Sequence, residues 1–394
     1  MESSGAVQMR DLCAEFLASG YEITVMTSSA ELKKSAYLYE ENAGLKILRV
    51  PGFKSKNVGL FRRALSEFSA PLRMLWVLLF YRPFNRRFQG IIWYSPTIFL
   101  GLVVHYLKWR NGCRAYLILR DIFPDWALHT GALKKGIPFY ILKSVANYQY
   151  WVANYIGVQA RGNLKHLSSW DIPKIRRVEV LNNWLSRSTG RPSSIQITET
   201  KLEGRKIFVY AGNMGLAQGM QILFELAYNL RDNSEYGFLF VGRGEALERY
   251  RADPRFLTLP NILFHDFIDP SEIHDLYKQC YVGLLCLDVK HQTHNIPGKF
   301  LSYMASELPV LASVNPNNDL IEMIEHFEVG AVIDNGSVEL LLSKLLYLDQ
   351  QLQTQKVLIK ANCHAISRNL FDTKVAVKQT VSYTHLTLPT TERV

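Results

Sequence analysis

Cysteine is scarce in this sequence and falls into no pattern. The five cysteines are dispersed over 394 residues without a C-x-x-C pair: Cys13, Cys113, Cys280, Cys286 and Cys363. An odd, dispersed set indicates neither a disulfide framework nor a zinc knot. We therefore expect a reducing, cytoplasmic compartment.

Several nucleotide and metal fingerprints are also absent. There is no G-x-G-x-x-G, no glycine loop followed by G-K-[ST], and no D-x-D pair to hold a magnesium nucleotide. The dinucleotide and P-loop fingerprints are thereby excluded. Asp288, His291 and His294 are of metal-ligand type, but no cysteine or second acid accompanies them. We expect no metal and no cofactor.

Acidic residues are rare in the first half of the chain. Through Gly190 there are 26 Lys and Arg against 12 Asp and Glu, and the remainder has 19 against 23. Between Asn42 and Arg120 the only acid is Glu67. This charge favours an anionic partner, and we predict an anionic membrane surface. The alternative is a basic face that contacts only water. Nucleic acid as the partner is not supported, because no recognised nucleic-acid-binding motif accompanies the charge.

Long apolar runs are missing as well. Met74 to Tyr81 and Thr97 to Leu107 are apolar, but a membrane span needs about 20 such residues. The first run lies among basic residues and includes Trp76 and Phe80. The pattern predicts a surface that lies on lipid, or else ordinary core helices.

What the sequence does contain is a regular alternation of strand and helix patterns, which predicts two doubly wound α/β domains. Strands are expected at 21–27, 45–50, 90–94, 113–119, 155–159 and 178–181, and then at 206–211, 237–241, 262–267, 281–287, 308–312 and 330–333. We predict an N-terminal domain over 1–185, a linker over 186–204, a C-terminal domain over 205–350 and closing helices over 351–380. The first strand of the N-terminal domain is expected to be missing, and 381–394 resembles a non-native tail.

The stretch that begins at Pro297 is the most informative one. It follows an apolar strand, and proline at a first helical position predicts a helix start there. Gly298 and Lys299 would bring free N–H groups and a cation to that helix end. A lysine there opposes the helix dipole, so its position is better explained by a bound anion. We predict a phosphate site at Lys299.

Two glycine loops follow earlier strands of the same half. Gly212, Asn213 and Gly215 come after the strand at 206–211, and Gly242 and Arg243 come after the next. Glycine allows a ligand to approach the backbone closely. The alternatives are a tight turn without a ligand and a solvated arginine.

Polar residues follow three strands of the first half at one sheet edge. Arg120, Asp121 and Asp125 follow the strand at 113–119, and two amide-bearing loops follow the next strands with Gln159, Asn163 and Asn182. Carboxylates and amides there can orient sugar hydroxyls across an interdomain cleft. They can equally form local Asx turns or cap helices.

Taken together, these residues resemble the family-4 (group 1) glycosyltransferases, and most closely the fucosamine-transferase-like subgroup of O-antigen and capsule synthesis. The resemblance rests on Gln8 to Thr27, Arg120 to Pro124, Gln159 to Leu164, Leu181 to Trp184, Phe208 to Gly219, Phe240 to Gly244, Asp269 to Tyr277 and Pro297 to Ser313. The chain departs from the family at His294 and Ser302, where two glutamates are usual, and at Arg120, where many relatives have histidine.

The resemblance implies a GT-B fold and retaining transfer from a UDP-sugar, in this subgroup an N-acetylated deoxyamino sugar, to a lipid-linked saccharide. It implies that Gly212, Lys299 and their neighbours bind the donor diphosphate, and that Arg120 and Asp121 meet the sugar. Localisation would be peripheral, on the inner face of a bacterial membrane. A nucleotide-sugar epimerase of similar plan, or an inactive truncated fragment that binds membrane or partners, remains open.

Overall fold

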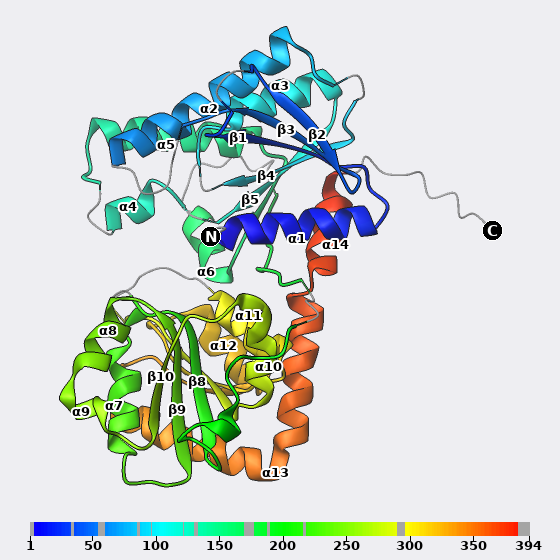
Figure 1. The fold of residues 1–394 in the computed structure, drawn as a ribbon. Coiled ribbons are helices and arrows are strands. Elements are labelled where there is room, and N and C mark those ends of the chain that lie inside the picture. Colours follow the sequence, from blue (N-terminus) through cyan, green and yellow to red (C-terminus); the bar gives the residue numbers. More distant parts are fainter. Residues whose placement is uncertain are drawn as a thin grey trace. The chain divides into compact units, whose positions relative to one another are not determined.

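The computed structural model describes residues 4–32, 35–53, 60–84, 87–95, 97–120, 122–129, 133–168, 177–186, 190–215, 218–289 and 296–384. The chain divides into two units: unit 1 contains Met1–Asn182 and Thr373–Val394, and unit 2 contains Asn183–Asp372. Each unit has mostly parallel strands wrapped by helices (Figure 1). The predicted class of two Rossmann-like α/β domains is therefore confirmed. The expected strand before residue 4 stays a prediction.

Unit 1 contains two sheets. A four-stranded parallel sheet has the order β4-β5-β6-β7, with β4 Gly90–Ser95, β5 Arg114–Leu119, β6 Tyr155–Val158 and β7 Arg177–Val180. In the three-stranded sheet, β3 (Leu45–Pro51) lies between parallel β1 (Thr24–Ser29) and antiparallel β2 (Leu38–Asn42). In the described part of the chain no strand joins β1 to β4. The carboxyl ends of β5, β6 and β7 share one edge.

Helices cover both faces of the four-stranded sheet. The bounds in unit 1 are α1 Ser4–Ala18, α2 Leu60–Phe80, α3 Gly101–Asn111, α4 Asp125–His129, α5 Ile137–Val152, α6 Arg161–Ser168 and α14 Thr373–Thr384. Leu117 of β5 packs in one core with residues of α3 and α5. Tyr116 points to the opposite face and donates to Glu179, which also accepts from Gln379 of α14. Helix α14 is thus part of unit 1 and continues four residues into the expected tail.

Unit 2 is built on a six-stranded parallel sheet. Its strands are β8 Lys206–Asn213, β9 Tyr236–Arg243, β10 Ile262–Asp266, β11 Val282–Cys286, β12 Val310–Ser313 and β13 Gly330–Ile333, in the order β10-β9-β8-β11-β12-β13. Numbered from the start of the unit, this order is 3-2-1-4-5-6. It reverses between β8 and β11, which makes that position the topological switch point.

Two apolar cores cover the faces of this sheet because alternate residues of each strand point to opposite sides. Phe208 and Tyr210 of β8 belong to one core, and Ile207 and Val209 to the other. The helices are α7 Gln221–Asn229, α8 Glu245–Ala252, α9 Pro254–Leu257, α10 Ile273–Lys278, α11 Gly298–Ala305, α12 Asp319–His326 and α13 Val338–Leu370, with short 3-10 turns η1 Ile197–Glu199 and η3 Pro270–Glu272.

Asp349 attaches helix α13 to the amino-terminal edge of the sheet. Its carboxylate accepts from Lys206 Nζ at 2.8 and 2.9 Å and from the hydroxyls of Tyr236 (3.1 Å) and Tyr281 (2.9 Å). Burial opposes ionisation of Asp349, but these hydrogen bonds outweigh it and lower its pKa. The network stabilises the edge away from the loops that follow β8 and β11.

All twelve strands expected from the sequence pattern are present, with ends that differ by a few residues. Among the described residues, β2 is the strand that the pattern missed. Residues 190–204 of the expected linker pack onto unit 2: Ser193 N–H donates to Asp275, Ser194 N–H donates to Glu272, and Leu202 is fully buried. Backbone amides and an apolar side chain therefore hold this segment against the second core.

Candidate functional site

The switch point of unit 2 brings together the two loops that the sequence singles out. One follows β8 and the other follows β11, and these strands are hydrogen-bonded neighbours. Open parallel sheets bind ligands outside the carboxyl ends of their strands at such a point. We use the name glycine-lysine site for the expected residues gathered here: Gly212, Asn213, Gly215, Gly242, Arg243, Pro297, Gly298 and Lys299.

Glycine lets the last residues of β8 and β9 pack backbone against backbone, because both strands run two residues further than expected and pair at Gly212 and Gly242. Gly212 and Gly242 have φ of +133° and +147°, and a Cβ on Gly242 would lie 2.0 Å from the carbonyl oxygen of Gly212. Met214 N–H donates to Arg243 O at 2.8 Å, and Met214 O accepts from Ala246 N–H at 3.0 Å. These two hydrogen bonds hold Met214, directly after β8, against the end of β9 and the start of α8.

Helix α11 begins at the same edge with its amino end uncompensated. Pro297 is the N-cap and the helix starts at Gly298, one residue later than expected. Proline at the N-cap has no side-chain oxygen to cap this end, and among the described residues the first turn of α11 contains no acid. Helix α12, by contrast, is capped by Asn318 and has two acids in its first turn. The partial positive charge of α11 is left for a ligand.

Lys299 lies between this helix end and the last residues of β8. Its Nζ is 4.6 Å from the ring centroid of Tyr210. A Cβ on Gly212 would lie 2.9 Å from Lys299 Cε and 3.3 Å from Nζ. Burial lowers the pKa of the Lys299 ammonium, with a smaller opposing effect from Cys286. A desolvated cation beside a glycine turn and an uncapped helix end is suited to a phosphate or diphosphate.

The remaining expected residues of this site lie nearby but are less enclosed. Asn213 is exposed at the end of β8. Arg243 is also exposed, and its guanidinium carbon lies 5.3 Å from the Phe267 ring centroid. The stacking orients Arg243 without burying its charge.

Asn183 was not among the expected site residues, although its neighbour Asn182 was. Its side chain is 7% exposed, and Nδ2 donates to Ile296 O, directly before Pro297, at 3.2 Å. Its Oδ1 is buried without a partner among the described residues. Asn183 therefore holds the chain that leads into α11. The sequence shows that two asparagines follow a strand, which indicates amide side chains at the sheet edge. It does not show which of the two contacts the segment before α11.

The expected residues of unit 1 lie along one edge of its four-stranded sheet. Arg120 follows β5, Gln159 follows β6 and Asn182 follows β7, while Asn163 is in α6. Asp121 lies outside the described residues. These positions are described within unit 1 alone.

Arg120 is nearly buried, at 5% exposure. Its Nη2 donates to Gln8 Oε1 at 2.7 Å, and the guanidinium carbon is 5.8 Å from the Tyr94 ring centroid. Asp125 begins α4 and is 3.5 Å from Lys143 Nζ. Both residues are thus held by neighbours in unit 1, which limits the directions from which a ligand can reach them.

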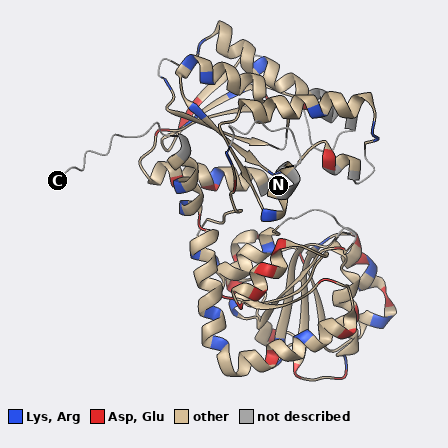
Figure 2. Ribbon diagram, turned by 180° about the vertical axis from the view of Figure 1, so that it is seen from behind, with Lys and Arg blue, Asp and Glu red and all other residues tan. Residues whose placement is uncertain are grey.

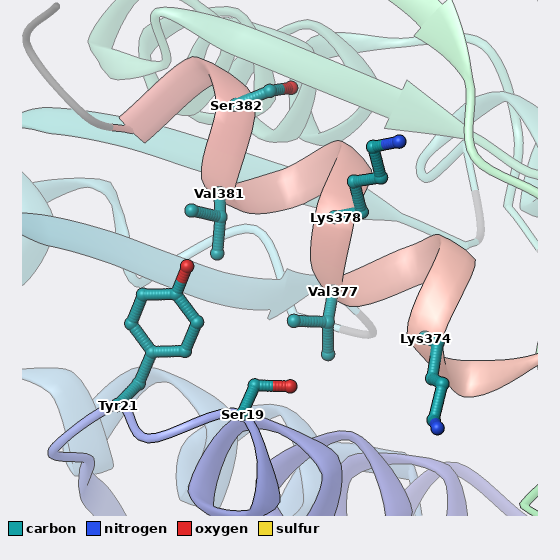
Figure 3. A pocket seen from close by; sticks show the side chains of 7 residues that line it. All are labelled: Ser19, Tyr21, Lys374, Val377, Lys378, Val381 and Ser382. Carbon is teal, nitrogen blue, oxygen red and sulfur yellow. The ribbon is translucent and has the colours of Figure 1, made fainter. Parts of the chain in front are cut away.

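A separate hollow in unit 1 is lined by Ser19, Tyr21, Lys374, Val377, Lys378, Val381 and Ser382. Figure 3 shows the side chains of Lys374 and Lys378 pointing away from each other. The two ammonium groups therefore do not converge on one anion, and we assign this hollow no ligand.

In the described ranges, no three His, Cys, Asp or Glu side chains are placed to hold a metal ion, and His291 and His294 lie outside those ranges. We also find that none of the described helices has the length and apolar character of a membrane span.

Comparison with known proteins shows what the chain is similar to. Residues 205–351, which lie in unit 2, match the family described as glycosyl transferases group 1. The complete two-domain architecture is the GT-B fold. Sucrose-phosphate synthase from Thermosynechococcus elongatus superposes with TM-score 0.67, at 13% identity over 96% of this chain and 92% of that one.

Two further proteins are similar to the chain, one in structure and the other in sequence. The lipopolysaccharide glycosyltransferase WaaG superposes with TM-score 0.57, at 13% identity over 95% of this chain and 94% of its own. The probable glycosyltransferase WbjE of Pseudomonas aeruginosa is 23% identical over 243 residues, which cover 60% of this chain and 60% of that protein. The match thus spans less than two thirds of this curated relative.

Proposed function

We propose that this protein is a retaining glycosyltransferase that moves a sugar from a UDP-sugar to a lipid-linked saccharide in surface polysaccharide synthesis. The observation that carries the proposal is Lys299, a desolvated cation at the uncapped start of α11, inside the segment that matches the group 1 family. The fucosamine-transferase-like subgroup and an N-acetylated deoxyamino sugar are the finer parts of this proposal.

The donor diphosphate would lie against the backbone from Gly212 to Gly215, with Lys299 beside it. As the sugar leaves, negative charge grows on the nucleoside diphosphate. The ammonium and the amino end of α11 are fixed in position, so they stabilise that charge with little reorganisation. This arrangement uses no metal ion.

Unit 1 would supply the sugar and acceptor side of the reaction. Arg120 and Asp121 are proposed to meet the sugar, and the side chains after the other strands are proposed to orient hydroxyl groups of donor or acceptor: Asp125, Gln159, Asn163 and Asn182. The anomeric configuration of the sugar is retained if the acceptor hydroxyl attacks from the face that the leaving phosphate vacates.

The proposed location is the cytoplasmic face of a bacterial inner membrane. Support comes from the excess of basic residues in the first half of the chain. Further support is the similarity to WbjE and to WaaG, the latter described as involved in lipopolysaccharide biosynthesis.

Lys299→Met tests the donor site because it removes the charge and keeps most of the side chain. Loss of a charge-assisted hydrogen bond should weaken UDP binding roughly 10- to 150-fold. Lys201→Met is the matched control: Lys201 is another partly desolvated lysine of unit 2, bonded to Leu259 O at 2.8 Å. UDP affinity is measured by titration calorimetry and transfer with a panel of UDP-sugars and lipid-linked acceptors.

Equal UDP affinity in wild type and Lys299→Met would contradict the site assignment. Conversion of the donor sugar to its epimer without any acceptor would contradict transfer and identify the protein as an epimerase.

A further inference from the structure

The outward side of helix α2 is apolar. Five of its side chains are 43% to 72% exposed: Phe68, Leu72, Trp76, Leu79 and Phe80. Their spacing of three to four residues places them on one stripe. The opposite side of α2 is buried through Met74, Val77 and Leu78. A helix with apolar residues on both its core side and its solvent side has a surface that water does not favour.

Helices α3 and α5 show the same feature. On α3, Leu102 and Trp109 are 49% and 79% exposed. On α5 the side chains that are 45% to 76% exposed are Ile137, Tyr140, Ile141 and Trp151. Their buried sides pack into the core with β5. We call the eleven exposed side chains of α2, α3 and α5 the aromatic face.

The three stripes belong to one layer. Helix α3 packs against both α2 and α5, and Figure 1 shows α2 and α3 next to each other. His105 of α3 is hydrogen-bonded to Tyr148 of α5 at 2.7 Å, and its ring centroid is 5.5 Å from that of Trp151. The ring centroid of Phe68 of α2 is 5.5 Å from that of Phe99, two residues before α3. The exposed apolar side chains therefore belong to helices of one packed layer, and Phe68 and Trp151 contact aromatic rings of or next to the adjoining helix.

The charged residues on and next to these helices indicate what kind of partner could bind the aromatic face. The sequences of the three helices contain six Lys or Arg and a single acid, Glu67. Arg82, just after α2, and Lys134 and Lys135, just before α5, are exposed. Figure 2 shows the basic segments on these helices. A partner must bury aromatic side chains and also carry negative charge.

We propose that the aromatic face docks unit 1 on an anionic lipid bilayer. Trp and Tyr side chains enter the headgroup region, where an apolar ring and a polar edge are both accommodated, and the exposed Arg82, Lys134 and Lys135 pair with lipid phosphates. A bilayer meets both requirements over a broad surface and needs no shape complementarity. This inference rests on the proposed function, in that it names the membrane surface at which the enzyme would meet a lipid-linked acceptor.

Vesicle sedimentation of the full chain tests the proposal. Phosphatidylcholine vesicles are compared with vesicles that contain roughly 30% phosphatidylglycerol, for wild type and for Trp109→Ser/Ile141→Ser. The double variant should bind anionic vesicles at least about tenfold more weakly, because the large apolar side chains that wild type buries in the bilayer are replaced by serine. Lys134→Glu/Lys135→Glu should weaken binding to anionic vesicles and leave the small binding to neutral vesicles unchanged.

The matched control is Val357→Ser/Leu358→Ser on α13 of unit 2, where the side chains are 85% and 52% exposed. It should bind vesicles like wild type. Wild type without vesicle binding, or equal losses in the control and the face variant, would overturn the proposal. So would a dimer that the face variant dissociates in the absence of lipid, which would identify a protein interface.

Failure of the proposed function would be recognised separately. UDP binding by titration calorimetry does not depend on the aromatic face, so both double variants of unit 1 should keep it. Vesicle binding without UDP binding contradicts the enzyme proposal alone, and UDP binding without vesicle binding contradicts the membrane proposal alone.

Discussion

Gly212→Ala should move Lys299 and weaken donor binding, although it adds only one methyl group. The new Cβ would lie 2.9 Å from Lys299 Cε. Ordinary carbon contacts are about 3.5 to 4.0 Å, so the lysine must shift by roughly 0.6 Å or more. Cε is near the end of a flexible side chain, so it moves more easily than the backbone. We expect UDP affinity to fall about tenfold, below the roughly 150-fold limit for complete loss of the interaction.

The backbone effect of the substitution has to be separated from this displacement. Gly212 has a φ of +133°, and a residue with a Cβ in such a conformation costs about 1 to 3 kcal/mol of folding stability. Gly204→Ala is the control, because Gly204 also has positive φ (+75°) but nothing lies within 4 Å of its Cβ position. Both variants should have a lower melting temperature, and only Gly212→Ala should lose UDP affinity.

Calorimetric titration with UDP and thermal unfolding are the two assays. In a Lys299→Met background, Gly212→Ala should add little further loss of affinity, because both changes act through the same ammonium. The reasoning is refuted if Gly212→Ala binds UDP as well as Gly204→Ala, or if the two losses of affinity at Gly212 and Lys299 are additive.

Two further predictions concern the same site. Burial lowers the pKa of Lys299, and a bound diphosphate favours its charged form, so UDP affinity should decline as pH rises through this lowered pKa, before an ordinary lysine titrates. The free protein should gain stability over that same range, because the unfolded chain then binds more protons. Lys299→Arg should bind UDP without the alkaline decline, and a decline like that of wild type would contradict the assignment. Asn183→Ala should raise the dissociation constant for UDP by loosening the chain before α11, whereas Asn261→Ala, which also removes a buried amide bonded to a backbone carbonyl, should lower only the melting temperature. Equal UDP affinities in the two variants would show that Asn183 has only a structural role.

Local pattern predicted most of the fold because the strands of both units are short apolar runs between helical segments. The exception, β2, has the sequence LYEEN and lacks such a run. It is a strand because it pairs with β3, where Glu40 accepts from Arg49 at 2.8 Å. A partner strand and an ion pair are tertiary features, so the local sequence could not indicate them.

The candidate site was predictable in part. Proline before Gly298 and Lys299 predicts an anion-binding helix start because helix-end chemistry is local. The sequence also shows that glycine follows the apolar run at 206–211, which becomes the main part of β8. It could not show that Gly212 approaches Lys299 closely or that Asn183 is the asparagine bonded to Ile296, because these contacts join segments far apart in the chain.

By itself, the sequence determined the class of fold, the helix start at Pro297, the cation beside it and the excess of basic charge in the first half. Each of these depends on neighbouring residues or on composition. The tertiary structure decided which residues meet. The strand order places the loop after β8 beside the loop after β11, and the packing of α2, α3 and α5 decides which of their apolar side chains stay exposed. Apolar periodicity shows that a side chain avoids water, and only the folded chain shows whether the core has room for it.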